Sequence, residues 1–123
     1  MYAIAAVGLL TVVFSTLMAA SPERWSRGII TFAAKPYFHI AEISSRTLLG
    51  LVLLIFAGST LYPVFIMIVG GVFLFAGVFL IFAGPRRHRE FAVRSAGFKK
   101  VFRPAGIAGA AFGAFIIYTA LAG

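Results

Sequence analysis

The sequence predicts an all-α integral membrane protein with four transmembrane helices and cytoplasmic amphipathic interfacial helices. Of the 123 residues, 62% are hydrophobic and 11% are charged, whereas about a quarter of the residues in a soluble domain are charged. The 11 basic and 3 acidic residues all fall in two windows, at 21–46 and 84–104. The uncharged stretches outside these windows are long enough to cross a hydrocarbon core of about 30 Å.

The first and last uncharged stretches each predict one span. The middle stretch, 47–85, is nearly twice as long and contains a turn-like break that begins at Gly58 and ends at Pro63. Proline has a fixed φ and no backbone N–H, so Pro63 suits the first turn of a new helix. We therefore predict spans at about 2–20, 46–61, 63–83 and 104–122.

The first span has an alternative interpretation as a signal peptide. Ala19 and Ala20 are small residues of the kind that precede a cleavage site. However, no Lys or Arg precedes the apolar run, as the basic region of a signal peptide would require. We therefore expect this segment to be the first transmembrane helix.

Four spans with a tight hairpin between the second and the third place both charged windows on one side of the membrane. The windows carry net charges of +2 and +6, while the hairpin and the chain ends carry no charged side chain. The positive-inside rule then predicts that both windows are cytoplasmic and both termini periplasmic, in a bacterial inner membrane. Tyr2, Tyr62 and Tyr118 would lie near the outer interface, which tyrosine rings favour.

The chain is expected to form a single membrane domain, 1–123, with two similar halves at 1–62 and 63–123. A shift of 63 residues aligns Pro22 with Pro85 and Arg24 with Arg87. A duplication of this kind would relate the halves by an axis along the membrane normal, because both halves have the same orientation.

A motif that begins at the end of the first span resembles small two-helix inner-membrane proteins of the bacterial YjeT-like family. The resemblance covers roughly residues 7–60. Its residues are Pro22, Arg24, Trp25, Arg27, Arg46 and Gly50. The second half follows the motif only at Pro85, Arg87, Arg103 and Gly106, without the tryptophan. The family has no established activity, so the resemblance implies the architecture and leaves the function open.

Both charged windows predict helices beside the membrane surface. Ser21 and Pro22 form a favourable helix start, after which Trp25, Ile29 and Phe32 recur on one face. Cations near a membrane surface attract anionic headgroups by on the order of 1 kcal/mol each. The alternative, which we favour, is that they only fix orientation and depth. The residues concerned are Arg24, Trp25, Arg27, Arg86, Arg87, Arg89, Arg94, Lys99, Lys100 and Arg103.

The last span carries a face of small residues that predicts close helix packing. Its members are Ala105, Gly106, Gly109 and Gly113. Glycines four residues apart let another helix backbone approach closely. The sequence leaves open whether that helix belongs to the same chain or to another subunit.

The sequence contains no recognisable catalytic or metal-binding motif. Without cysteine there are no disulfides, thiolate metal sites or cysteine nucleophiles. The two histidines have no repeated metal-ligand spacing. His88 stands in a run of arginines and is expected to be solvated, whereas His39 is placed near the interface, where it could contact a haem or chlorophyll. We expect no cofactor and no enzymatic activity, and the absence of a nucleic-acid-binding motif argues against a nucleic-acid partner.

Two function classes remain. The first is a non-enzymatic accessory or scaffold subunit of a larger bacterial inner-membrane complex, of respiratory or photosynthetic type, that packs against partner helices and lipid. The alternative is a small homo-oligomeric channel or transporter. The spans carry no ionisable side chain, and ion-coupled transporters generally need one. The expected partners are therefore membrane lipids, in particular anionic headgroups, and either other membrane subunits or further copies of the chain.

Overall fold

The computed structural model describes residues 2–123, and this part of the chain folds into helices joined by short turns. The helices in order are α1 (Tyr2–Ala20), α2 (Pro22–Ala33), α3 (Phe38–Phe56), the short 3-10 helix η1 (Ala57–Ser59), α4 (Pro63–Ser95) and α5 (Lys99–Ala122). Four segments are long and apolar enough to cross a membrane: α1, α3 together with η1, α4, and α5. The predicted all-α fold with four membrane-spanning helices is confirmed at this level.

Three helices extend beyond their predicted spans. Helix α3 begins at Phe38 instead of 46, and α5 begins at Lys99 instead of 104. In both cases the helix includes charged residues that precede the apolar span. Helix α4 runs past 83, but Gly84 interrupts it with φ 85° and ψ 162°. Only glycine adopts this backbone region readily. The predicted end of the third span therefore coincides with a sharp change of direction inside α4.

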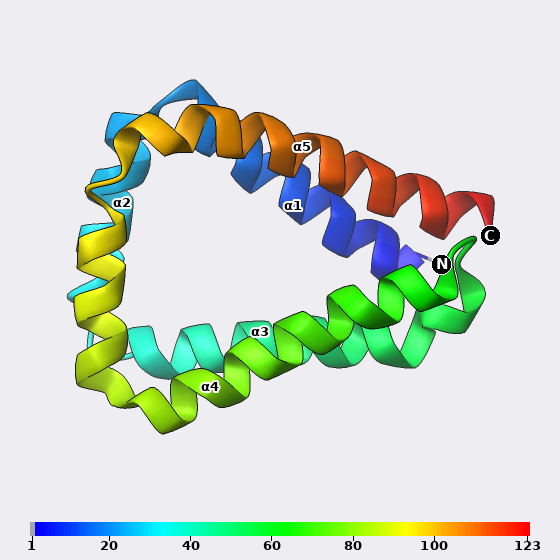
Figure 1. Cartoon of the computed structure of the whole chain (residues 1–123), viewed down its shortest axis with the longest axis horizontal. Coiled ribbons are helices and arrows are strands. Elements are labelled where there is room, and N and C mark those ends of the chain that lie inside the picture. The colour runs from blue at the N-terminus through cyan, green and yellow to red at the C-terminus, as the bar shows by residue number, and fades with distance from the viewer. Residues whose placement is uncertain (1) are drawn as a thin grey trace.

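The four long helices form two antiparallel pairs, α1 with α5 and α3 with α4 (Figure 1). The pairs converge where the start of α1 and the end of α5 meet the turn between α3 and α4 (Figure 1). There the backbone N–H of Leu61 donates to the carbonyl of Thr119 over 2.8 Å. At the opposite, wide end the pairs diverge and are bridged by α2 and the last part of α4 (Figure 1).

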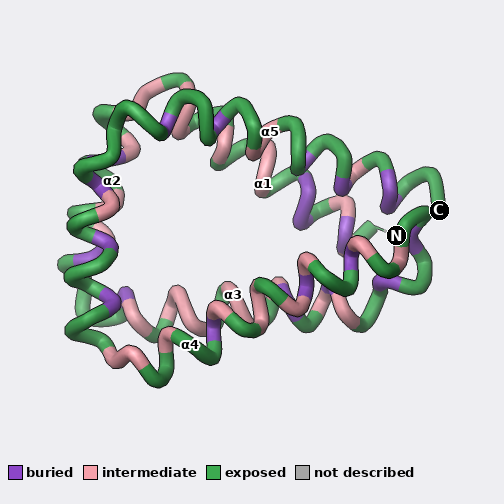
Figure 2. The backbone as a smooth tube through the Cα atoms, in the orientation of Figure 1, coloured by how far each residue is buried: buried purple, intermediate pink, exposed green. Residues whose placement is uncertain are grey.

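The main apolar core lies at the narrow end, where all four long helices meet (Figure 2). Its buried residues are Ile4, Val7, Leu53, Ala57, Ile66, Ile116 and Ala120. A second, smaller cluster at the wide end joins α2, α3 and α4 through Ala33, Phe38 and Ala92. The two helix pairs are thus held together at both ends of the molecule.

Each helix pair depends on a close approach at glycine. A Cβ atom added to Gly113 of α5 would lie 2.7 Å from the carbonyl oxygen of Gly8 in α1. In the other pair, a Cβ atom added to Gly50 of α3 would lie 2.8 Å from the carbonyl oxygen of Gly70 in α4. Because both neighbours are backbone atoms, they cannot move aside as a side chain could. Close approach of this kind favours helix association in a bilayer through van der Waals contact.

The two pairs make corresponding contacts. A shift of 62 residues takes Gly8 to Gly70, and a shift of 63 takes Gly50 to Gly113, so one glycine contact maps onto the other. The duplication itself stays a hypothesis, but the halves contribute matching elements to the two pairs.

The bridge at the wide end follows the same correspondence. The Ser26 hydroxyl donates to the carbonyl of Ala96 over 2.7 Å, and the Arg89 Nε donates to the carbonyl of Ala33. A shift of 63 residues converts Ser26 into Arg89 and Ala33 into Ala96. Each hydrogen bond therefore joins the positions that correspond to those joined by the other, with the two halves interchanged. Together the two bonds hold α2 against the last part of α4.

The substitution Gly113→Ala should destabilise the α1–α5 pair by about 1–3 kcal/mol, because the new methyl group meets backbone atoms. The matched control is Gly71→Ala, since a Cβ atom there meets nothing within 4 Å. Removing a helical glycine at that open position should stabilise the protein by about 0.5–1 kcal/mol. Reversible unfolding in mixed micelles, followed by circular dichroism, measures both changes. Equal effects of the two substitutions would contradict the packing described.

Candidate functional site

Both charged windows lie at the wide end of the molecule and contact one another. The Lys99 ammonium pairs with the Glu23 carboxylate over 3.1 Å, which joins the start of α5 to the start of α2. The Arg103 Nε donates to the carbonyl of Ala19 over 3.2 Å at the end of α1. Since both members of the ion pair are largely exposed, these contacts position the helix ends more than they stabilise the fold.

The predicted anchoring residues divide into two groups. Arg86 pairs with Glu90 on the exposed side of α4, while Arg89, Lys99 and Arg103 make the contacts given above. The remaining cations are exposed, and their side chains make no hydrogen bond or ion pair with another residue in the described range 2–123: Arg24, Arg27, Arg87, Arg94 and Lys100. Trp25 is half-buried, with its ring centroid 6.3 Å from that of Phe14.

The predicted small-residue face of α5 lies mostly against α1 of the same chain. A Cβ atom added to Gly106 would lie 2.5 Å from the carbonyl oxygen of Ser15, and one added to Gly109 would meet the Ser15 side chain. Gly113 contacts α1 as described above. Ala105 is exposed. Of the two arrangements that the sequence left open, packing within the chain is the one that the structure contains.

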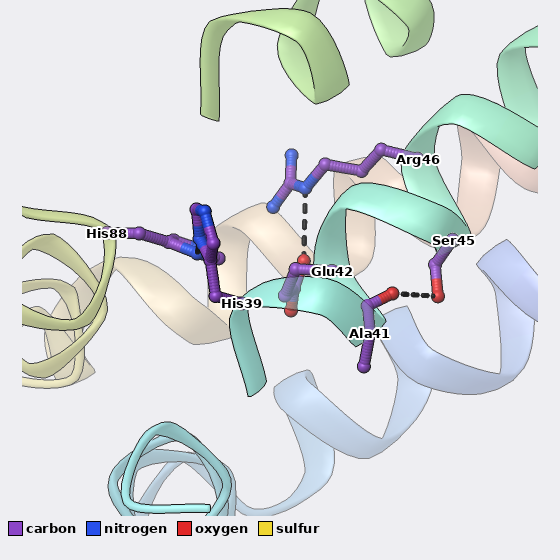
Figure 3. A network of polar contacts seen from close by, with 6 residues as sticks. All are labelled: His39, Ala41, Glu42, Ser45, Arg46 and His88. Carbon is purple, nitrogen blue, oxygen red and sulfur yellow. Dashed lines mark hydrogen bonds and ion pairs between the residues drawn. The ribbon is translucent and has the colours of Figure 1, made fainter. Parts of the chain in front are cut away.

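His88 is buried, and the expectation that it is solvated is wrong. Its exposed fraction is 4%, and its ring stacks on Phe38 with the centroids 4.3 Å apart. The Nδ1 atoms of His88 and His39 lie 2.9 Å apart (Figure 3). The arginines around His88 are exposed although His88 is buried, because the segment is helical and residues 88, 92 and 96 form its buried face. This spacing of four was the signal in the sequence that could have identified His88 as buried.

The contact between the two histidines requires a specific distribution of protons. A hydrogen bond between two Nδ1 atoms needs one that carries a proton and one that carries a free lone pair. At least one of the two rings is therefore neutral while the bond exists. Protonation of both rings removes the acceptor and leaves two cations in contact.

Glu42 and Arg46 extend this cluster along α3. The Arg46 Nε donates to Glu42 Oε2 over 3.0 Å (Figure 3). Positions 39, 42 and 46 are three and four residues apart, so they share one face of the helix. This face of α3 therefore contacts His88 of α4 through His39 and carries the ion pair of Glu42 with Arg46.

Three members of this cluster, Glu42, Arg46 and His88, line a pocket of about 710 Å³ between α2, α3 and α4. Its polar lining includes Glu42, Arg46, Arg87 and His88. Its apolar lining includes Phe79, Leu80, Phe82 and Phe91. The volume lies within the range of about 300–1,000 Å³ that small-molecule sites occupy. The pocket thus offers a polar end and a hydrophobic wall to one ligand.

Several polar side chains at and near the pocket are already paired with one another. Among the described residues, no group of three or more His, Asp or Glu side chains could hold a metal ion. Glu42 is engaged by Arg46, and the two histidines bond one another. The side chains that remain around the pocket offer cationic charge and apolar contact.

Comparison of the chain with protein families, with curated proteins and with solved structures finds no match. These comparisons do not bear on the resemblance to YjeT-like proteins, which stays a prediction.

The histidine contact can be tested directly because the chain contains only two histidines. In protein labelled with ¹⁵N-histidine in micelles at neutral pH, we expect one ring with a protonated Nδ1 that couples to the Nδ1 of the other ring. The coupling should vanish in His39→Ala, and also at acidic pH once both rings carry two protons. Two uncoupled rings that both carry their proton on Nε2 in the unsubstituted protein would contradict the contact.

Proposed function

We propose that the protein is a non-enzymatic accessory subunit of a larger complex in the bacterial inner membrane. The observation that carries this proposal is how little of the spanning helices the chain covers by itself. Only 17–28% of the residues in the four apolar windows are buried within the chain. The rest of these helix faces must be covered by lipid or by helices of other subunits, because an aqueous environment would expose too much apolar surface.

The distribution of exposed aromatic rings supports partner packing. Phe75 and Phe79 stack on α4 with their centroids 6.4 Å apart, and both are more than half exposed. Tyr62, Phe115 and Tyr118 form a similar exposed row at the narrow end. Large rings on an outer face supply contact area to a neighbouring helix at a low cost in side-chain entropy.

The same proposal includes an orientation in the membrane. The wide end, with both charged windows, is cytoplasmic, and the narrow end, with both termini, is periplasmic. In this orientation α2 and the last part of α4 run along the cytoplasmic interface, since both run across the ends of the spans (Figure 1). Their exposed cations then meet lipid headgroups, and their apolar sides meet the protein.

Affinity capture of the tagged chain after gentle extraction of native membranes tests the proposed function. We expect other membrane subunits to be retained in a fixed ratio to the chain, as measured by quantitative mass spectrometry. A tagged unrelated four-span protein serves as the control for unspecific retention. Recovery of the chain alone would contradict the proposal, and a defined homo-oligomer would favour the channel or transporter alternative and lead to flux measurements in liposomes.

The orientation can be tested with single cysteines because the chain contains none. Lys35→Cys lies at the wide end and Ser59→Cys at the narrow end, and both positions are exposed. A membrane-impermeant maleimide added to spheroplasts should label Ser59→Cys at once. It should label Lys35→Cys only after the membrane is permeabilised. The reverse pattern would overturn the orientation, and labelling of both from outside would overturn the four-span topology.

A further inference from the structure

The two helix pairs carry side chains of different size at the place where the pocket lies. In the first half, Phe14 and Trp25 pack against one another. A shift of 62 residues takes Phe14 to Ala76, and a shift of 63 takes Trp25 to His88. Ala76 and His88 both line the pocket. In the second half, a methyl group thus stands where the first half has a phenyl ring, and an imidazole stands where it has an indole. The smaller side chains leave the space that forms the pocket.

The apolar side of this space faces the region where a bilayer would lie. Phe79, Phe82 and Leu80 line it from the end of the third span, before the break at Gly84. Phe82 is 85% exposed, so its ring lacks a partner within the described chain. A hydrocarbon chain that extends along α4 from the pocket would cover these side chains.

The polar side carries more positive charge than the protein neutralises. Arg87 makes no side-chain hydrogen bond or ion pair with any residue in the range 2–123. Arg46 binds Glu42 through Nε, and its terminal amino groups make no further hydrogen bond in the described part of the chain. The pocket lining thus contains two guanidinium groups and a single carboxylate, which pairs with Arg46 and not with Arg87. Arginine donors are well suited to phosphate oxygens because of their planar fork of N–H groups.

We propose that this pocket binds one phospholipid with an anionic headgroup. Its phosphate lies between Arg46 and Arg87, and one acyl chain runs along Phe79, Leu80 and Phe82. The uncompensated charge favours an anionic lipid over a neutral ligand such as a quinone, and the apolar wall favours a lipid over free phosphate. This site goes beyond general attraction to the membrane surface, and it is independent of whether the chain has partner subunits.

Native mass spectrometry of the full chain tests the charge requirement. Dioleoylphosphatidylglycerol added to the detergent-solubilised protein should be retained as one molecule per chain, and in preference to dioleoylphosphatidylcholine. Arg87→Gln should lower the affinity for the anionic lipid about fivefold, the equivalent of about 1 kcal/mol per cation. The matched control is Arg86→Gln, which removes a neighbouring exposed cation that pairs with Glu90, and it should leave the affinity within twofold of the starting value.

A second pair of variants tests the volume requirement while all charges stay in place. Ala76→Phe restores the bulk of Phe14 at the corresponding position and should abolish retention of the lipid. Ala108→Phe adds the same ring at an exposed position of α5 outside the pocket and should retain the lipid. Thermal unfolding of both variants shows whether the fold is kept. If Ala76→Phe does not fold, the comparison of Arg87→Gln with Arg86→Gln decides by itself.

Three results would overturn the proposal. The first is equal retention of the anionic and the zwitterionic lipid. The second is an unchanged affinity in Arg87→Gln. The third is displacement of the lipid by millimolar glycerol 3-phosphate or inorganic phosphate, which would assign the site to a soluble anion. Each readout uses the isolated chain, so failure here leaves the partner-capture experiment unaffected.

Discussion

The close backbone contact within each helix pair is the interaction on which the rest of the fold depends. In a bilayer the hydrophobic effect does not drive helices together, so van der Waals contact between closely spaced backbones supplies the attraction. The contacts of Gly8 with Gly113 and of Gly50 with Gly70 select α1 with α5 and α3 with α4. Since α1 and α5 lie at opposite ends of the sequence, the segments between the spans must bridge the two pairs at the wide end, and the pocket lies beside that bridge.

The change of direction at Gly84 determines what the bridge can bring together. Its positive φ turns the last part of α4 out of the direction of the span and across the wide end. A straight continuation of the helix would carry residue 88 away from α3. The turn instead places His88 against Phe38 and His39, and it leaves Arg87 at the edge of the pocket. One backbone torsion angle therefore couples the arrangement of the spans to the chemistry of the site.

The sequence predicted the local features of this fold better than its long-range contacts. Uncharged length predicted the four spans, and the predicted end of the third at 83 lies next to the break at Gly84. The glycines of α5 predicted close packing but not its partner, because small residues permit approach by any helix of matching shape. His88 was misjudged because its neighbours in sequence are arginines, while its neighbours in space belong to α3. Helical spacing, and not local composition, determines which side of such a segment is buried.

The two halves differ at some positions without any change in the contacts between helices, and at others with a change in side-chain volume. At one pair of matching positions, Ser26 and Arg89 are chemically unlike, yet each donates a hydrogen bond to the carbonyl at the matching position of the other half. The framework thus tolerates a change of donor as long as the bond is kept. At Phe14 and Ala76 the difference alters volume, which no hydrogen bond can compensate. Because the helix pairs keep matching contacts despite this difference, the space beside His88 is not required to hold the fold together, and its polar and apolar lining fits the proposed phospholipid.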